Sequence, residues 1–227
     1  MTIGILDDGI GVFSTYDKLK QAVCANFIIQ LLDDSFPLSR ASSSALFNIG
    51  KKAIGNLTNM GCDVIVLSSS ALSSLYKRFT SVSSVPLYSC DAPVMHACTY
   101  TASNVLVCCD GSYCRRHSLP NVMYCVMDNF SQIAETAQEQ QIVDYIEQSV
   151  SCYVGQFDCV ALAGSSMNTY KGCFRRVCPN VRIFDSLDGV ARRIRKKYKR
   201  TSADDGFCRV INGKGDDISE KYRAFFE

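Results

Sequence analysis

The sequence lacks three features that would point to a membrane, an export route or a nucleic-acid partner. None of the apolar runs in its 227 residues reaches the roughly 18 residues of a spanning helix. Residues 1–7 contain neither the basic region nor the apolar region of a signal peptide. The net charge is only +2, which implies no bulk electrostatic attraction to nucleic acid or membrane. We therefore expect a cytoplasmic protein that does not contact a membrane.

Histidine is scarce and the Cys-x-x-Cys motif is absent, although the chain contains 13 cysteines. Cys109 and Cys114, followed by His117, form the closest approach to a metal motif, but no second pair stands at zinc-like spacing. We predict no metal site. Because the number of cysteines is odd and no export signal accompanies them, we expect most to be reduced and buried as small apolar groups.

Apolar runs and helical stripes alternate along the chain. Two stripes with spacings of three and four residues predict helices, with Ser186 as the N-cap of the second. The stripes are Leu46, Ile49, Ala53, Leu57, Met60 and Leu187, Val190, Ala191, Ile194, Tyr198. The predicted strands are Ile3 to Leu6, Phe27 to Leu32, Val64 to Leu67, Leu87 to Ser89, Val105 to Cys108, Met123 to Val126, Val160 to Leu162 and Arg182 to Phe184. This alternation predicts a parallel α/β sheet.

A faint internal repeat relates residues 62–70 to residues 157–165. Each segment has an Asp, an apolar strand and a run of small residues, and a Tyr-Lys pair follows each of them. Small residues at the carboxyl end of a strand let backbone amides approach a ligand. The repeat is consistent with two similar domains that face one cleft, and also with two ordinary strand-to-helix turns.

The opening segment, Ile3 to Gly11, resembles the signature IGVFDSGIGG of the glutamate racemases, within the aspartate/glutamate racemase family. Pro37 to Ser39 stands where that family has a Pro-Tyr-Gly loop. Residues 61–73 resemble its GVDLIVIACNTAS segment, and residues 158–166 stand at its DTLILGCTHYP segment. Ile183 to Ser186 resembles its LIDS strand end. The order and spacing of these segments hold over nearly the whole chain.

The resemblance implies two pseudo-symmetric α/β domains, with mainly parallel sheets flanked by helices and an active site in the cleft between them. The first domain would comprise residues 1–93 and 201–227, and the second would comprise residues 94–200. It also implies ancestry in racemisation without a cofactor, in which one cysteine removes the α-proton and another returns a proton on the opposite face.

Neither catalytic cysteine position of the family holds a cysteine in this chain. The first is Ser69, and the second is Gly164, or Ser165 if one residue is inserted. Two-base racemisation needs two groups that act as both base and acid near neutral pH, and a serine hydroxyl is a weak base unless another base activates it. The family histidine beside the second cysteine is also missing, because Ser166 or Met167 stands there.

The resemblance places Asp7 in the cleft with Ser69 and Ser165, although an Asp at a strand end also fits a helix cap or turn. Asp8 replaces a family serine beside the bound amino acid. Two like charges about 4 Å apart at an effective dielectric near 20 cost roughly 4 kcal/mol, so Asp8 disfavours a dicarboxylate and suits an amine, a cation or a polar neutral group. The substrate-binding positions by resemblance are Asp8, Pro37, Leu38, Ser39, Ser70, Ala71 and Ser166.

Three functional hypotheses follow. The first is a racemase-like protein without the two-cysteine chemistry that binds a small amino acid or carboxylate in the cleft. The second is an active racemase or isomerase that uses Asp7, Asp8 or Ser69 as its bases. The third is an interaction protein whose basic run, residues 192–200, binds nucleic acid or an acidic partner. Solvated cations on an ordinary amphipathic helix explain that run better, because Ile194 and Tyr198 belong to its apolar stripe and leave the cations on the solvent face. A homodimer is one assembly that we consider.

Overall fold

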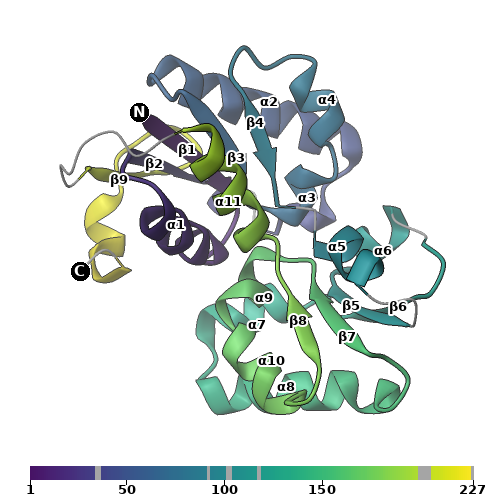
Figure 1. Cartoon of the computed structure of the whole chain (residues 1–227). Helices are drawn as coiled ribbons and strands as arrows, with labels where there is room; N and C mark the ends of the chain where they lie inside the picture. The colour runs from purple at the N-terminus through teal and green to yellow at the C-terminus, as the bar shows by residue number, and fades with distance from the viewer. Residues whose placement is uncertain (34–36, 91–92, 101–103, 117–118, 199–205, 226–227) are drawn as a thin grey trace.

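The strands form two separate parallel sheets, which occupy two lobes of the molecule (Figure 1). The computed structural model describes residues 1–33, 37–90, 93–100, 104–116, 119–198 and 206–225, without the side chains of residues 93–96, 112, 115 and 116. The first sheet has the order β4-β3-β1-β2-β9 and the second has the order β6-β5-β7-β8. Every strand pair is parallel. The predicted fold class, parallel α/β with two domains, is confirmed.

All eight predicted strands are present, to within one residue at each end. The strands of the first sheet are β1 (Thr2–Asp7), β2 (Asn26–Leu31), β3 (Val64–Leu67), β4 (Leu87–Ser89) and β9 (Cys208–Ile211). Those of the second are β5 (Val105–Cys109), β6 (Val122–Val126), β7 (Cys159–Leu162) and β8 (Arg182–Phe184). The central strands are apolar on both faces because helices cover both sides of each sheet.

Helices sandwich the first sheet. Ile3 and Ile5 point to the face covered by α1 (Gly11–Ala22) and α11 (Leu187–Lys197), while Leu6 points to the opposite face. That opposite face is covered by η2 (Leu38–Arg40), α2 (Ser43–Asn59), α3 (Ser70–Ser73) and α4 (Tyr76–Thr80). The first predicted stripe therefore lies on α2, where Leu46, Ala53 and Leu57 are buried, as predicted.

The second sheet has the same layered construction. Leu106 and Cys108 of β5 point into one core, and Val105, Val107 and Cys109 point into another. The first core is closed by α7 (Phe130–Thr136), α8 (Glu139–Val150), α9 (Ser165–Thr169) and α10 (Lys171–Val177). The second is closed by α5 (Pro93–Tyr100) and α6 (Gly111–Arg116), and η3 (Ser151–Tyr153) follows α8.

Helix α11 follows the second sheet in sequence but packs on the first one (Figure 1). Its apolar face contributes Leu187, Val190 and Ile194 to the core beside α1, and its cations up to Lys197 are exposed. Residues 199–200 of the basic run lie outside the described residues. We predicted a domain boundary near residue 200. The division at that residue stays a prediction, and α11 belongs to the first core by its contacts.

Ser186 occupies the N-cap position of α11, as predicted, but its side chain does not cap the helix. Its hydroxyl makes no capping bond to α11 and instead accepts a hydrogen bond from Asn168 Nδ2 at 3.2 Å. Asp185 takes the capping role, because its Oδ1 accepts from the amides of Leu187 at 3.0 Å and Asp188 at 3.2 Å. A carboxylate at this end also suits the helix dipole.

The C-terminal segment returns to the first domain. Strand β9 extends the first sheet by pairing with β2, and η4 (Ser219–Phe225) lies against α1. The predicted anchors Ile218 and Tyr222 pack on the first core, and Phe225 stacks on Phe13 with ring centroids 4.2 Å apart.

All 13 cysteines are free thiols, and eight of them are buried, in line with the prediction. Among the described residues there is no group of three or more His, Cys, Asp or Glu that could hold a metal ion, and His117 lies outside them. No helix in the part of the chain that the structure describes has both the length and the apolar character needed to cross a bilayer.

Candidate functional site

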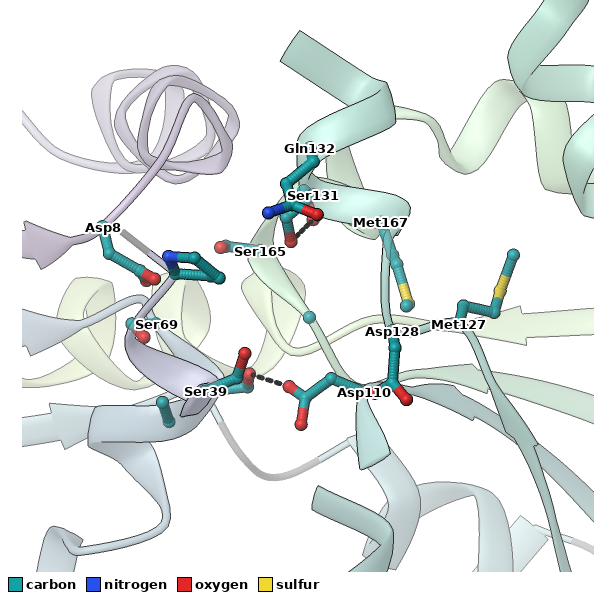
Figure 2. Close-up of a pocket in the computed structure, with 15 residues that line it drawn as sticks. Asp8, Ser39, Ser69, Asp110, Met127, Asp128, Ser131, Gln132, Ser165 and Met167 are labelled. Carbon is teal, nitrogen blue, oxygen red and sulfur yellow. Dashed lines mark hydrogen bonds between the residues drawn. The ribbon is translucent and has the colours of Figure 1, made fainter. Parts of the chain in front are cut away.

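The carboxyl ends of strands from both sheets meet at one cleft, where open α/β sheets usually bind their ligands. A cavity of about 40 Å³ lies there. Its described lining residues come from both domains (Figure 2): Asp8, Pro37, Ser39, Ser69, Ser70, Ala71, Asp110, Met127, Asp128, Ser131, Gln132, Gly164, Ser165, Ser166 and Met167. A volume of this size holds only a few water molecules. The cleft is therefore nearly closed, and an amino acid needs it to widen.

Two side-chain hydrogen bonds cross the cleft. Ser165 Oγ of the second domain donates to Asp7 Oδ1 of the first at 3.2 Å. Ser70 Oγ of the first domain donates to Asp110 Oδ2 of the second at 3.2 Å. These contacts join residues at the carboxyl ends of four different strands, so they hold the two strand-end segments together.

The backbones of the two domains approach each other closely at Gly11, the first residue of α1. A Cβ atom on Gly11 would lie 2.4 Å from the backbone C of Ser165 and 2.4 Å from the N of Ser166. Such distances are far inside normal contact, so only glycine fits here. Close to this point, Ser14 and Thr169 share a short hydrogen bond between their hydroxyl groups.

Asp7 lies behind the cleft, at the end of β1, and only 1% of it is exposed. Burial raises the pKa of its carboxyl group well above the ordinary value, and the charge of Asp8 raises it further. The hydroxyls of Ser68 and Ser165 and the amide of Asp8 act in the opposite direction. Its Oδ2 atom has no hydrogen-bond partner within the described part of the chain. Asp7 is therefore a group that tends to keep its proton.

Asp8 lies at the cleft surface and is held by the backbone of another loop. Its Oδ2 atom accepts a hydrogen bond from the amide of Leu38 at 2.7 Å. The Leu38 side chain itself is fully buried in the core of the first domain and does not line the cavity. The predicted binding position Leu38 therefore contributes its amide to the orientation of Asp8.

The predicted site residues assemble in one place, with two exceptions. Eight of them line the cavity: Asp8, Pro37, Ser39, Ser69, Ser70, Ala71, Ser165 and Ser166. Asp7 and Leu38 do not, although each bonds to a lining residue. Their proposed roles in binding or chemistry stay predictions.

The sequence reasoning missed the lining residues of the second domain that follow β5 and β6. Asp110 comes directly after β5, and Asp128 comes two residues after β6. Both are anchored by backbone amides, because Asp110 Oδ1 accepts from Tyr113 N at 2.9 Å and Asp128 Oδ1 accepts from Gly111 N at 2.6 Å. An acidic residue just past the carboxyl end of each predicted strand was the signal that could have found them.

Solved structures with the same architecture span nearly the whole chain. No family model and no curated protein matches the sequence. A glutamate racemase from Bacillus anthracis is similar with a TM-score of 0.83 and 13% identity, covering 98% of this chain and 94% of that one. A glutamate racemase from Francisella tularensis in complex with D-glutamate has a TM-score of 0.75 and 12% identity, covering 99% and 91%. An aspartate racemase from Picrophilus torridus has a TM-score of 0.63 and 14% identity, covering 99% and 98%.

The chain has the fold of the aspartate/glutamate racemases.

Within this racemase fold, the segments that resemble the two cysteine motifs occupy equivalent places in the two domains. Ser69 is the second residue after the end of β3 and precedes α3. Gly164 is the second residue after the end of β7 and precedes α9. The backbone amides of the preceding residues make matching hydrogen bonds. Ser68 N donates to Leu6 O, and Ala163 N donates to Cys108 O, each at 2.9 Å. The internal symmetry therefore pairs Ser69 with Gly164.

Thiol and imidazole groups are absent from the described lining of this racemase-like cleft. Cys90 lies near Asp7 but is buried outside the cavity. Burial raises the pKa of its thiol to about 12, and the charge of Asp7 contributes to that rise. A thiol with so high a pKa is not a base at neutral pH.

Proposed function

We propose that this chain binds a small amino acid in the cleft between its domains and does not racemise it by two-thiol chemistry. The carrying observation is the pair Ser69 and Gly164, which stands at the two equivalent strand ends where the family resemblance places the catalytic cysteines. A glycine has no side chain to exchange a proton. A serine hydroxyl is a weak base unless another base activates it.

The fold supports an amino acid as the ligand class. The similar racemase from Francisella tularensis was solved with D-glutamate, and the one from Escherichia coli with L-glutamate. In the cleft of this chain, small residues follow the ends of β3 and β7. Small side chains leave room for a ligand backbone to approach the loops once the domains separate.

Ligand entry requires a change in the distance between the domains. The cavity of about 40 Å³ is too small for an amino acid, and the bonds from Ser165 to Asp7 and from Ser70 to Asp110 cross it. We propose that these two bonds open on binding and that the cleft closes again around the ligand. Neither bond involves Ser69 or Gly164, the residues at the two equivalent strand ends.

A second candidate function is catalysis through the bond between Ser165 and Asp7. Asp7 has a raised pKa and lies 3.2 Å from the Ser165 hydroxyl, which lines the cavity. This arrangement supplies one acid/base relay. It does not supply a second one on the opposite side of the cleft, where racemisation needs it. A one-sided proton transfer is therefore the chemistry that this candidate predicts.

A panel of D- and L-amino acids, screened by thermal unfolding, tests the proposal. A ligand at about 100 times its dissociation constant stabilises the folded state by about 2.7 kcal/mol. For a domain of this size, that raises the melting temperature by about 5 to 10 °C. We expect at least one amino acid to produce this shift.

A matched pair of glycine variants locates the binding. Gly164→Leu fills the cavity, since an added Cβ would find only ordinary contact with Met167, at 3.6 Å. Gly172→Leu, on the exposed side of α10, has nothing within 4 Å of an added Cβ. We expect the first variant to lose the ligand-induced shift and the second to keep it. A panel without any shift, or equal shifts in both variants, would overturn the proposal.

A further inference from the structure

All the charged residues in the described lining of the cleft have the same sign. Three carboxylates line it, Asp8, Asp110 and Asp128, and no Lys, Arg or His is among its described lining residues. They come from both domains and follow three different strands, so closure of the domains brings them around one ligand (Figure 2).

Two of these carboxylates are held by backbone amides, which carry no charge and do not neutralise them. Asp8 Oδ2 accepts from the Leu38 amide, and Asp128 Oδ1 accepts from the Gly111 amide at 2.6 Å. Neither residue takes part in any ion pair found among the described residues. Each therefore presents a carboxylate to the cavity with its second oxygen available to a ligand.

A second cavity beside the cleft is also lined by carboxyl groups. It has a volume of about 240 Å³ and shares Asp8 with the cleft. Among its described lining residues, Asp33 and Glu135 add two more carboxyl groups, and Lys221 is the one cation. Lys221 Nζ lies over the ring of Tyr222, 5.2 Å from its centroid, so the carboxyl groups are what this cavity offers to a ligand cation. The volume gives an extended side chain room beyond the small cleft.

Asp7 lies behind the lining of the cleft and reaches it only through its bond to Ser165. It is almost completely buried, and its Oδ2 atom has no hydrogen-bond partner among the described residues, while its Oδ1 atom bonds to Ser165 in the cavity wall. Buried polar atoms without a partner are rare in folded proteins, and a ligand or water commonly explains them.

We infer that the amino acid bound in this cleft has a positively charged side chain, an ammonium or a guanidinium group, and that Asp8 and Asp128 select it. The inference rests on the proposed function, since it names the class of amino acid for the same cleft. It excludes the dicarboxylic amino acids, because their second carboxylate would face the acidic lining without a cation.

Isothermal titration calorimetry with four ligands of graded charge tests the inference. The ligands are lysine, norleucine, which has the same four side-chain carbons without the terminal amine, glutamate, and cadaverine, which keeps two amines without a carboxylate. We expect lysine to bind at least about tenfold more tightly than norleucine, the size of effect that a charge-assisted hydrogen bond gives. Lysine affinity should also fall as salt rises, while any norleucine affinity should not.

Isosteric variants assign the selectivity to residues. Asp8→Asn and Asp128→Asn keep an oxygen for the Leu38 and Gly111 amides and remove the charge. Each should weaken lysine binding by about tenfold or more. The matched control is Asp144→Asn, an exposed residue on α8 that accepts a bond from Gln140, and it should leave lysine affinity unchanged.

The outcomes separate the inference from the proposed function. Glutamate or norleucine binding as tightly as lysine would overturn the inference and leave amino-acid binding in place. Binding of cadaverine alone would support the charge selectivity and overturn the amino-acid proposal. A wild-type protein that binds none of the four would overturn the inference, and the wider amino-acid panel then decides the proposed function separately.

Discussion

The close approach at Gly11 gives a quantitative prediction for the substitution Gly11→Ala. The added Cβ would lie 2.4 Å from the backbone of Ser165 and Ser166, whereas carbon atoms pack best at about 3.5 to 4.0 Å. The neighbours are backbone atoms that cannot rotate away. Helix α1 and the start of α9 must therefore separate by roughly 1 Å, since that difference is what normal contact requires.

The cost of that separation should resemble overpacking of a core. Overpacking typically costs about 1 to 3 kcal/mol. One kcal/mol shifts the melting temperature of a 150–250-residue protein by about 2 to 4 °C, so we expect a decrease of about 2 to 12 °C. Thermal unfolding followed by circular dichroism measures the shift directly, and denaturant titration gives the free energy of unfolding for comparison.

The control is Gly55→Ala, a glycine inside α2 with nothing within 4 Å of an added Cβ. A replacement of this kind stabilises by about 0.4 to 1 kcal/mol, because it restricts the unfolded chain. The two variants should therefore move the melting temperature in opposite directions. If Gly11→Ala unfolds at or above the wild-type temperature, the backbone contact between the two domains is not as close as described.

Three further predictions concern single side chains. The raised pKa of buried Asp7 means that its charged form opposes folding. The free energy of unfolding should therefore fall by about 1.4 kcal/mol per pH unit from the unfolded pKa near 3.9 up to the folded pKa. Asp7→Asn should remove this loss, and equal pH profiles of unfolding for the wild type and the variant would contradict the prediction. Lys171→Met leaves the buried carboxylate of Asp185 without its ion-pair partner and should lower the free energy of unfolding by about 3 kcal/mol, as measured by denaturant titration. A change under about 1 kcal/mol would show that solvent already screens the pair. Phe225→Ala removes the ring stacked on Phe13 and should lower the free energy of unfolding by about 1 kcal/mol. Faster proteolysis of the C-terminal segment would confirm this prediction, and unchanged proteolysis would contradict it.

Much of the fold could be predicted because the core strands are locally distinct. β3 is Val64–Leu67, four apolar residues between polar neighbours, and its limits matched the prediction. β9 was missed because it is a short edge strand with the exposed Arg209 in its middle. Its place in the sheet depends on pairing with β2, almost 180 residues away in the sequence, and no local pattern encodes that pairing.

The candidate site could be predicted only in part, for a physical reason. Strand ends such as Ser69 and Gly164 carry a local signature of small residues after an apolar run. Asp110 and Asp128 reach the cleft because β5 and β6 lie side by side in the second sheet, and adjacency of strands is a property of the folded chain. The N-cap position of Ser186 could be predicted from the sequence, but the bonds from the first amides of α11 to the Asp185 carboxylate could not.

The central claim is that the chain has the racemase fold and that its cleft binds an amino acid without two-thiol racemisation. The most direct test is proton NMR of the amino acid that binds most tightly, incubated with the protein in D₂O. We predict that the α-proton signal keeps its full intensity at ligand saturation, because Ser69 and Gly164 offer no pair of acid/base groups. Loss of the α-proton signal at an enzymatic rate, with appearance of the opposite enantiomer, would contradict the account.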